Sequence, residues 1–213
     1  MKKIFLGLLF ILVILILTGC GGNGDKAPSN SKNAEIKGKV VIYTSMYEDI
    51  IDNVKEKLNE EFPNLEVEFF QGGTGTLQSK IAAEMQANKL GADILMVAEP
   101  SYSLELKEKG ILHAYISKNS ENLALDYDKE GYWYPVRILN MVLAYNPEKY
   151  SKDKVAQSFD EFAKRTDLSG KISIPDPLKS GTALAAVSAL TDKYGEGYFE
   201  ILAKQKPVVE SGS

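Results

Sequence analysis

The sequence predicts an α/β fold in which parallel strands alternate with helices. Between residues 39 and 110, short apolar or alternating segments typical of strands take turns with longer segments whose apolar residues recur at helical spacing. Three such strand and helix pairs follow one another along the chain. This order requires crossover connections, which are right-handed and produce a parallel sheet.

The three expected strands differ in pattern. Residues 40–43 and 93–98 are continuous apolar runs, which are typical of strands covered on both faces. Residues 65–69 alternate apolar side chains with glutamates, as in a strand with one face in water. We therefore expect the first and third strands in the interior of the sheet and the second at an edge, which gives the strand order 2-1-3.

A helix is expected after each strand. Ser45 and Glu48 match a capping box, so we expect the first helix to open there and to end near Phe62. The second helix follows the glycine-rich turn 71–76, and the third covers 101–110.

Ligands in open α/β sheets bind beyond the carboxyl ends of the strands, where the strand order reverses. For the order 2-1-3 this point lies between strands 1 and 3. Residues 44–47 and 99–102 follow these two strands, and the turn 72–76 lies beside them.

A second unit follows the first. The β-rich stretch 132–147 is expected to carry the chain from one domain into the other. Beyond it the patterns predict a short helix and turn within 159–171, a strand at 172–174, a helix at 182–190 buried on most sides, a helix near 196–205 and a strand at 207–209.

The N-terminal segment has the features of a lipoprotein signal. Lys2 and Lys3 precede an apolar run that is shorter than the roughly 18–20 residues needed to span a bilayer. The run ends in "LTGC", which looks like a bacterial lipobox with Cys20 as the lipid-modified residue. Several acyl chains hold a protein at a membrane, so we expect a lipid anchor on the extracytoplasmic face of the cell membrane. The expected organisation is a signal peptide at 1–19, a flexible tether at 20–37, lobe 1 at 38–131, and a crossover with a partial lobe 2 at 132–213.

Charge and residue usage exclude several function classes. The chain has 25 basic and 29 acidic residues, and only Lys2 and Lys3 precede Cys20, so the exported part carries a net charge near −6. A negative chain disfavours nucleic acid as a partner. The single histidine, His113, and the single cysteine leave no catalytic triad, nucleophile elbow or zinc motif. We expect a protein that is no enzyme and that uses no cofactor.

Glycine and hydroxyl residues recur at strand ends. Such loops at helix N-termini offer free N–H groups and a positive dipole end to an anion, although ordinary capping explains each one alone. The expected ligand-binding residues are Ser45, Gly73, Thr74, Gly75, Thr76, Ser180, Gly181, Thr182, Ser211, Gly212 and Ser213.

Tyr47 and Glu99 are candidates of another kind, because a phenolate and a carboxylate are oxygen donors that ferric iron prefers. Tyr47 would equally fit the apolar stripe of its helix. Glu99 directly follows an apolar strand, which packing explains less well.

The chain resembles the extracellular solute-binding proteins of ABC importers, specifically the iron(III)-type family. The segments that carry the resemblance are the lipobox, "VVIYTSMYEDI", "FFQGGTGTLQSKIAAE", "GADILMVAEPSYSLELKEKGIL", "YPVRILNMVLAYNP", "GKISIPDPLKSGTAL" and "KPVVESGS". The resemblance implies a two-lobed fold of the periplasmic-binding type II class that closes on a ligand and delivers it to a permease. For ferric iron it implies Tyr47 and Glu99 as metal ligands, together with a tyrosine pair that has no counterpart up to Ser213. Other members bind phosphorylated sugars or phosphonates.

We therefore expect a membrane-anchored solute-binding component of an ABC importer that captures ferric iron or a small anionic solute. The alternatives are an exported α/β enzyme and a surface sensor without a transport role. We also expect the 213 residues to be a truncated product or a fragment, because the chain crosses into the second lobe without a return segment.

Replacement of the proposed lipid-bearing residue tests the anchor. Cys20→Ala should release the protein from membranes or leave its signal uncleaved, because Cys20 is the chain's only thiol. Metabolic labelling with a radioactive fatty acid should mark the wild type alone. Label that persists in Cys20→Ala would rule out this lipoprotein assignment.

Overall fold

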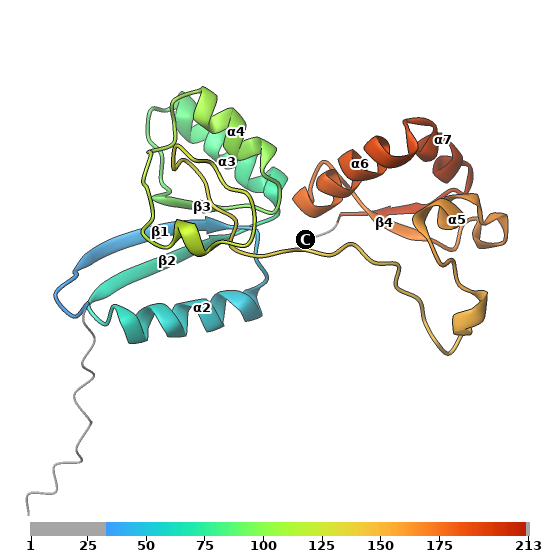
Figure 1. The fold of residues 1–213 in the computed structure, drawn as a ribbon, viewed down its shortest axis with the longest axis horizontal. Coiled ribbons are helices and arrows are strands. Elements are labelled where there is room, and N and C mark those ends of the chain that lie inside the picture. The colour runs from blue at the N-terminus through green and yellow to red at the C-terminus, as the bar shows by residue number, and fades with distance from the viewer. Residues whose placement is uncertain (1–32, 212–213) are drawn as a thin grey trace, which may run out of the picture.

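The computed structural model describes residues 33–211, which form two α/β lobes joined by an extended segment (Figure 1). The elements of lobe 1 are β1 (Gly38–Thr44), α2 (Glu48–Glu61), β2 (Leu65–Gln71), α3 (Thr74–Gln86), β3 (Ile94–Met96), α4 (Ser101–Glu108) and the 3₁₀ turn η1 (Ser120–Asn122). The elements of lobe 2 are η2 (Lys152–Lys154), α5 (Phe159–Lys164), η3 (Thr166–Leu168), β4 (Ser173–Pro175), α6 (Gly181–Tyr194), α7 (Gly197–Lys204) and β5 (Val208–Glu210).

The sheet of lobe 1 is parallel with the order β2-β1-β3, which confirms the predicted order. Helix α2 covers one face of the sheet, and α3 and α4 cover the other (Figure 1). Within the described residues β3 pairs only with β1, so the expectation that the third strand is interior is wrong for this part of the chain. Its first residue, Ile94, is accordingly 47% exposed.

Strand β2 has the expected wet face. Val67 is buried, while Glu66 and Glu68 on the opposite face form ion pairs with Lys39 of β1. The predicted capping box before α2 is wrong. Helix α2 begins at Glu48, and the residue at its N-cap is Tyr47, with no side-chain cap. Ser45 lies two residues before this N-cap. Its backbone continues the pairing of β1 with β3, because its N–H donates to the Met96 carbonyl at 3.0 Å.

The core of lobe 1 joins β1 to α3 and α4 through Tyr43, Leu77, Ile81, Tyr102 and Leu106. Leu77 is fully buried and Leu106 is 2% exposed. These residues lie on the apolar stripes that the helical spacing predicts.

A polar network closes this core at one edge. The Tyr43 hydroxyl donates to Glu84 at 2.8 Å, and Lys80 and the Gly91 N–H contact the same carboxylate at 2.8 and 3.0 Å. Burial alone would raise the pKa of Glu84, but these hydrogen bonds outweigh burial and hold the pKa below its ordinary value. The network therefore ties β1 to the C-terminal half of α3.

Lobe 2 has a two-stranded parallel sheet, β4-β5, covered by helices. Its core gathers Ala163, Ile172, Tyr198 and Leu202. The Tyr198 hydroxyl donates to the Phe159 carbonyl at 3.0 Å, and burial raises the pKa of this tyrosine to about 12.

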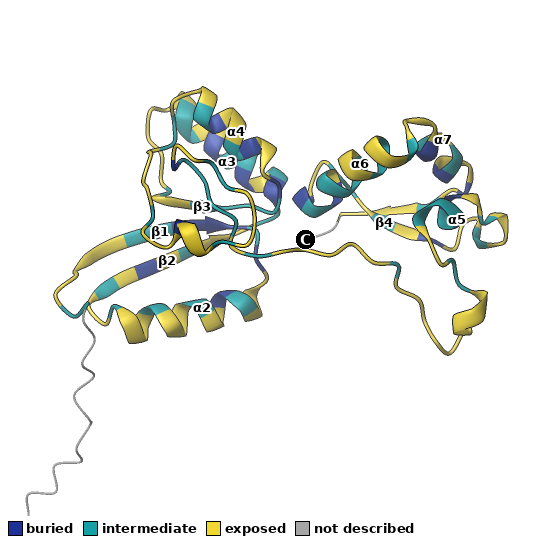
Figure 2. Cartoon of the chain, in the orientation of Figure 1, coloured by how far each residue is buried: buried dark blue, intermediate teal, exposed yellow. Residues whose placement is uncertain are grey.

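The prediction that the apolar helix of this lobe is buried on most sides is wrong for the described residues. Only Gly181 and Ala183 at the start of α6 are buried (Figure 2). The other apolar side chains of α6 are exposed or only partly buried, because few described elements pack against this helix.

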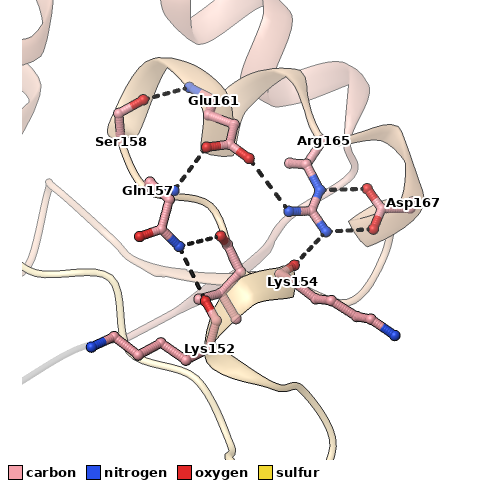
Figure 3. Close-up of polar contacts among 8 residues, drawn as sticks. Lys152, Lys154, Gln157, Ser158, Glu161, Arg165 and Asp167 are labelled. Atoms are coloured by element: carbon pink, nitrogen blue, oxygen red, sulfur yellow. Dashed lines mark hydrogen bonds and ion pairs between the residues drawn. The ribbon is translucent and has the colours of Figure 1, made fainter.

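Arg165 joins the irregular segments around α5 (Figure 3). Its guanidinium donates twice to Asp167 at 2.7 Å and once to the Lys154 carbonyl at 2.8 Å. Ser158 caps α5 by accepting from the Glu161 N–H at 3.1 Å, and the Glu161 carboxylate accepts from Gln157. Arg165 therefore has a structural role.

The crossover, residues 133–146, is extended and contains no regular secondary structure. Val136, Ile138 and Val142 in this segment are between 65% and 71% exposed. The β-rich composition is thus realised as extended chain, with no strand pairing among the described residues. Across residues 33–211, no helix is both long and apolar enough to cross a bilayer.

Two leucines of α4 provide a test of the lobe 1 core. Leu106→Ala should lower the free energy of unfolding by about 2–5 kcal/mol, because it leaves a cavity in a packed interior. Leu104→Ala, on the same helix but 46% exposed, should cost less than about 1 kcal/mol. Urea unfolding followed by circular dichroism measures both, and equal losses would contradict this core assignment.

Candidate functional site

A cavity of about 360 Å³ lies between the two lobes, a size that suits a small solute. Lobe 1 contributes residues that follow β1 and β3 and the start of α3, as the topological argument predicts. Lobe 2 contributes the start of α6 and the end of β4, and the crossover forms the rest. The lining residues are Ser45, Tyr47, Thr74, Ala98, Arg137, Leu139, Asn140, Met141, Pro175, Ser180, Gly181, Thr182 and Ala183.

Hydrogen bonds to the strand ends hold the loop after β1. The Thr44 hydroxyl is buried and accepts from the Met46 N–H at 3.1 Å. Ser45 is bound through its N–H to the end of β3. Tyr47 comes next, at the N-cap of α2, and is 54% exposed. It therefore borders the cavity and takes no place on the apolar stripe of α2.

The predicted glycine-rich turn is partly helical. Helix α3 begins at Thr74, so Thr74, Gly75 and Thr76 form its first turn. Thr74 is 3% exposed and lines the cavity, and its hydroxyl has no hydrogen-bond partner within the described part of the chain. A buried hydroxyl without a partner is costly unless something else supplies one.

The second wall is the start of α6. Ser180 is the N-cap, and its hydroxyl accepts from the Ala183 N–H at 3.3 Å. Within residues 33–211, the N–H groups of Gly181 and Thr182 donate to no acceptor, as expected for the first turn of a helix. The N-termini of α3 and α6 thus meet at one cavity, and each directs a positive dipole end towards it.

Arg137 is the site residue that the sequence reasoning missed. It lies in the crossover, lines the cavity, and forms no hydrogen bond or ion pair with any residue in the described range. The chain has only two arginines, and the other one, Arg165, is paired. A lone arginine in an apolar stretch between two lobes was the available signal.

Glu99 has a different environment from the cavity residues. It is 7% exposed, and its carboxylate accepts from the Ser101 N–H at 2.7 Å, the Ser101 hydroxyl at 2.5 Å and the Tyr102 N–H at 3.3 Å. These bonds satisfy the first N–H groups of α4. The carboxylate therefore acts as a helix cap, and its role as a metal ligand stays a prediction.

The other predicted residues lie apart from the cavity lining. Gly73 is the N-cap of α3, and Gly75 contacts lobe 2. Ser211 is exposed beyond β5. Cys20, Gly212 and Ser213 are outside the described residues.

The described residues contain no cluster of three histidine, cysteine or acidic side chains that could hold a metal ion. The cavity lining itself has one positive charge, that of Arg137, and no carboxylate. The free N–H groups, the hydroxyls and the guanidinium are all groups that bind an oxyanion.

The chain is similar in sequence to known proteins. The family model described as bacterial extracellular solute-binding protein matches residues 53–209. An uncharacterized protein of Haemophilus influenzae is 26% identical over 192 residues, which are 86% of this chain and 54% of that protein.

Solved structures share the fold. Iron-bound HitA from Pseudomonas aeruginosa has a TM-score of 0.68 at 21% identity, over 81% of this chain and 56% of HitA. AfuA from Actinobacillus pleuropneumoniae, a periplasmic binding protein with bound fructose-6-phosphate, has a TM-score of 0.66 at 25% identity, over 83% and 58%. The likeness confirms the expected fold class of periplasmic binding proteins. The chain spans about half the length of these relatives.

The role of Glu99 can be tested without a ligand. Glu99→Ala should lower the free energy of unfolding by about 1–2 kcal/mol, the usual cost of losing a helix cap. Glu108→Ala, an exposed position on the same helix, should change it by less than about 0.5 kcal/mol. Chemical unfolding of both variants checks this, and an unchanged stability for Glu99→Ala would contradict the capping role.

Proposed function

Because the chain belongs to the bacterial extracellular solute-binding proteins, we propose that it captures a small anionic solute outside the cell for the permease of an ABC importer. We propose further that Cys20 carries a lipid that holds the protein at the cell membrane. Membership of the family establishes a solute-binding protein, whereas the anionic solute, the permease and the lipid anchor are proposals.

The observation that carries the ligand assignment is the composition of the inter-lobe cavity. Arg137 is the one formal charge in the lining, the first turn of α6 presents the N–H groups of Gly181 and Thr182, and Thr74 and Thr182 add hydroxyls. An oxyanion accepts hydrogen bonds from groups of all three kinds, and hydrogen bonds to a charged group are the stronger kind. A phosphate monoester, with a sugar-sized remainder, suits the volume and the mixed polar and apolar lining.

Ferric iron is less well supported by the same cavity. Iron(III) prefers several anionic oxygen donors, whereas Tyr47 is the only phenol in the lining and Glu99 is engaged at α4. Among the relatives, the AfuA structure contains fructose-6-phosphate and the HitA structure contains iron. The positive charge of Arg137 in the cavity lining supports the anion as the ligand of this chain.

The assignment is tested by removing the guanidinium. Arg137→Met keeps an apolar stem and should weaken binding of fructose-6-phosphate at least tenfold, or about 1.4 kcal/mol. Isothermal titration calorimetry, with thermal-shift assays against inorganic phosphate and ferric citrate, measures the effect. Lys55→Met removes an exposed positive charge on α2 and should leave the affinity unchanged.

Two outcomes would contradict the proposal. One is tight ferric binding with a tyrosinate-to-iron absorption band that Tyr47→Phe removes. The other is equal affinity of the wild type and Arg137→Met for every phosphorylated ligand.

A further inference from the structure

The first turns of α3 and α6 touch each other across the two lobes. The Gly75 N–H donates to the Lys179 carbonyl at 3.4 Å, and Gly181 packs against the side chain of Thr74. Figure 2 shows buried residues at the facing ends of both helices. This contact is made by the same helix ends that line the cavity.

Neither glycine is required by its own backbone. Both have φ values in the ordinary range, where any residue is tolerated. Glycine within a helix is about 1 kcal/mol less favourable than alanine. The reason for glycine at these positions must therefore lie outside the local conformation.

The space around the two positions supplies that reason. A Cβ on Gly75 would come well under 3.0 Å from the Leu178 carbonyl oxygen and 3.3 Å from the Lys179 Cα, both in the opposite lobe. A Cβ on Gly181 would come 2.5 Å from the Thr74 hydroxyl oxygen and 3.0 Å from its Cβ. Three of these neighbours are atoms on or next to the backbone, so they cannot rotate away.

We propose that Gly75 and Gly181 are positioning residues of the solute site, because their missing side chains let the two helix N-termini meet. The contact brings the positive dipole ends of both helices to one cavity, next to the buried Thr74 hydroxyl and the first-turn N–H groups of α6. The link to a ligand rests on the proposed function, whereas the approach of the lobes does not.

The proposal separates lobe closure from lobe folding. Gly75→Ala and Gly181→Ala should keep each lobe folded, since alanine favours helix, but should hold the lobes further apart. Gly197 is the matched control: it is the first residue of α7, as Gly181 is of α6, and a Cβ there would meet nothing within 4 Å. Gly197→Ala should therefore change neither closure nor binding.

Spin labels at exposed positions 55 and 204, one in each lobe, report closure in the full chain with Cys20→Ser. Double electron–electron resonance without ligand should show longer distances for Gly75→Ala and Gly181→Ala, and an unchanged distribution for Gly197→Ala. Adding Thr74→Ala to Gly181→Ala removes the Thr74 hydroxyl oxygen and the Cγ2, 2.5 and 3.1 Å from the added Cβ, and should return part of the short-distance population. Fructose-6-phosphate affinity should fall at least tenfold in Gly75→Ala and Gly181→Ala.

Unchanged distances in both glycine variants would overturn the positioning role. Longer distances with undiminished affinity would also overturn it, because the site would then not depend on the contact. If the wild type binds no phosphorylated ligand, the proposed function fails while the distance measurement still tests closure. Circular dichroism checks that each variant is folded. If Gly75→Ala fails to fold, the comparison of Gly181→Ala with the double variant Gly181→Ala, Thr74→Ala still tests the proposal.

Discussion

The close approach of the two lobes depends on the absence of side chains at positions 75 and 181, where an added Cβ would clash with the opposite lobe. Each lobe has its own core, one around Leu77 and Leu106 and the other around Ala163 and Leu202. The cavity, in contrast, belongs to neither lobe and exists only when the two helix ends are near each other. Its polar character follows from the same geometry, because first-turn N–H groups have no partner inside their helix.

The two arginines show how one residue type can serve different purposes in the same chain. Arg165 uses its planar fork on Asp167 and a carbonyl, and so stabilises a short irregular region. Arg137 lies in an extended segment where no described group pairs with it, so its charge is available to a ligand. The difference lies in the surrounding backbone: turns around α5 bring acceptors to Arg165, and the crossover brings none to Arg137.

Local patterns in the sequence were enough to predict much of lobe 1. The alternation around Val67 identified the wet strand, and the apolar runs placed β1 beside it, because side-chain periodicity reports directly on burial. Ser45, Tyr47, Thr74, Ser180, Gly181 and Thr182 were all expected near a ligand and do line the cavity. They were accessible because strand ends in an open sheet converge in space.

The errors arose where contacts between distant segments override local signals. Ser45 has the sequence of a helix cap, yet its N–H is bound to Met96 of another strand, so the helix starts later. The contacts of Glu99 with the start of α4 were also not predicted, and its role as a metal ligand stays a prediction. Arg137 was overlooked because only the folded crossover places it in the lining of the cavity.

The crossover that joins the two lobes also determines how tight the contact between them must be for the lobes to close. A short flexible linker keeps its ends at millimolar effective concentration, so a lobe contact with an intrinsic dissociation constant of about 1 mM is formed roughly half the time. A solute that binds the closed form a hundredfold more tightly than the open form raises that fraction to about 99%. A weak contact of one long hydrogen bond and two closely packed glycines is then sufficient for closure in the presence of ligand. The bound solute itself contributes most of the free energy that holds the two lobes together.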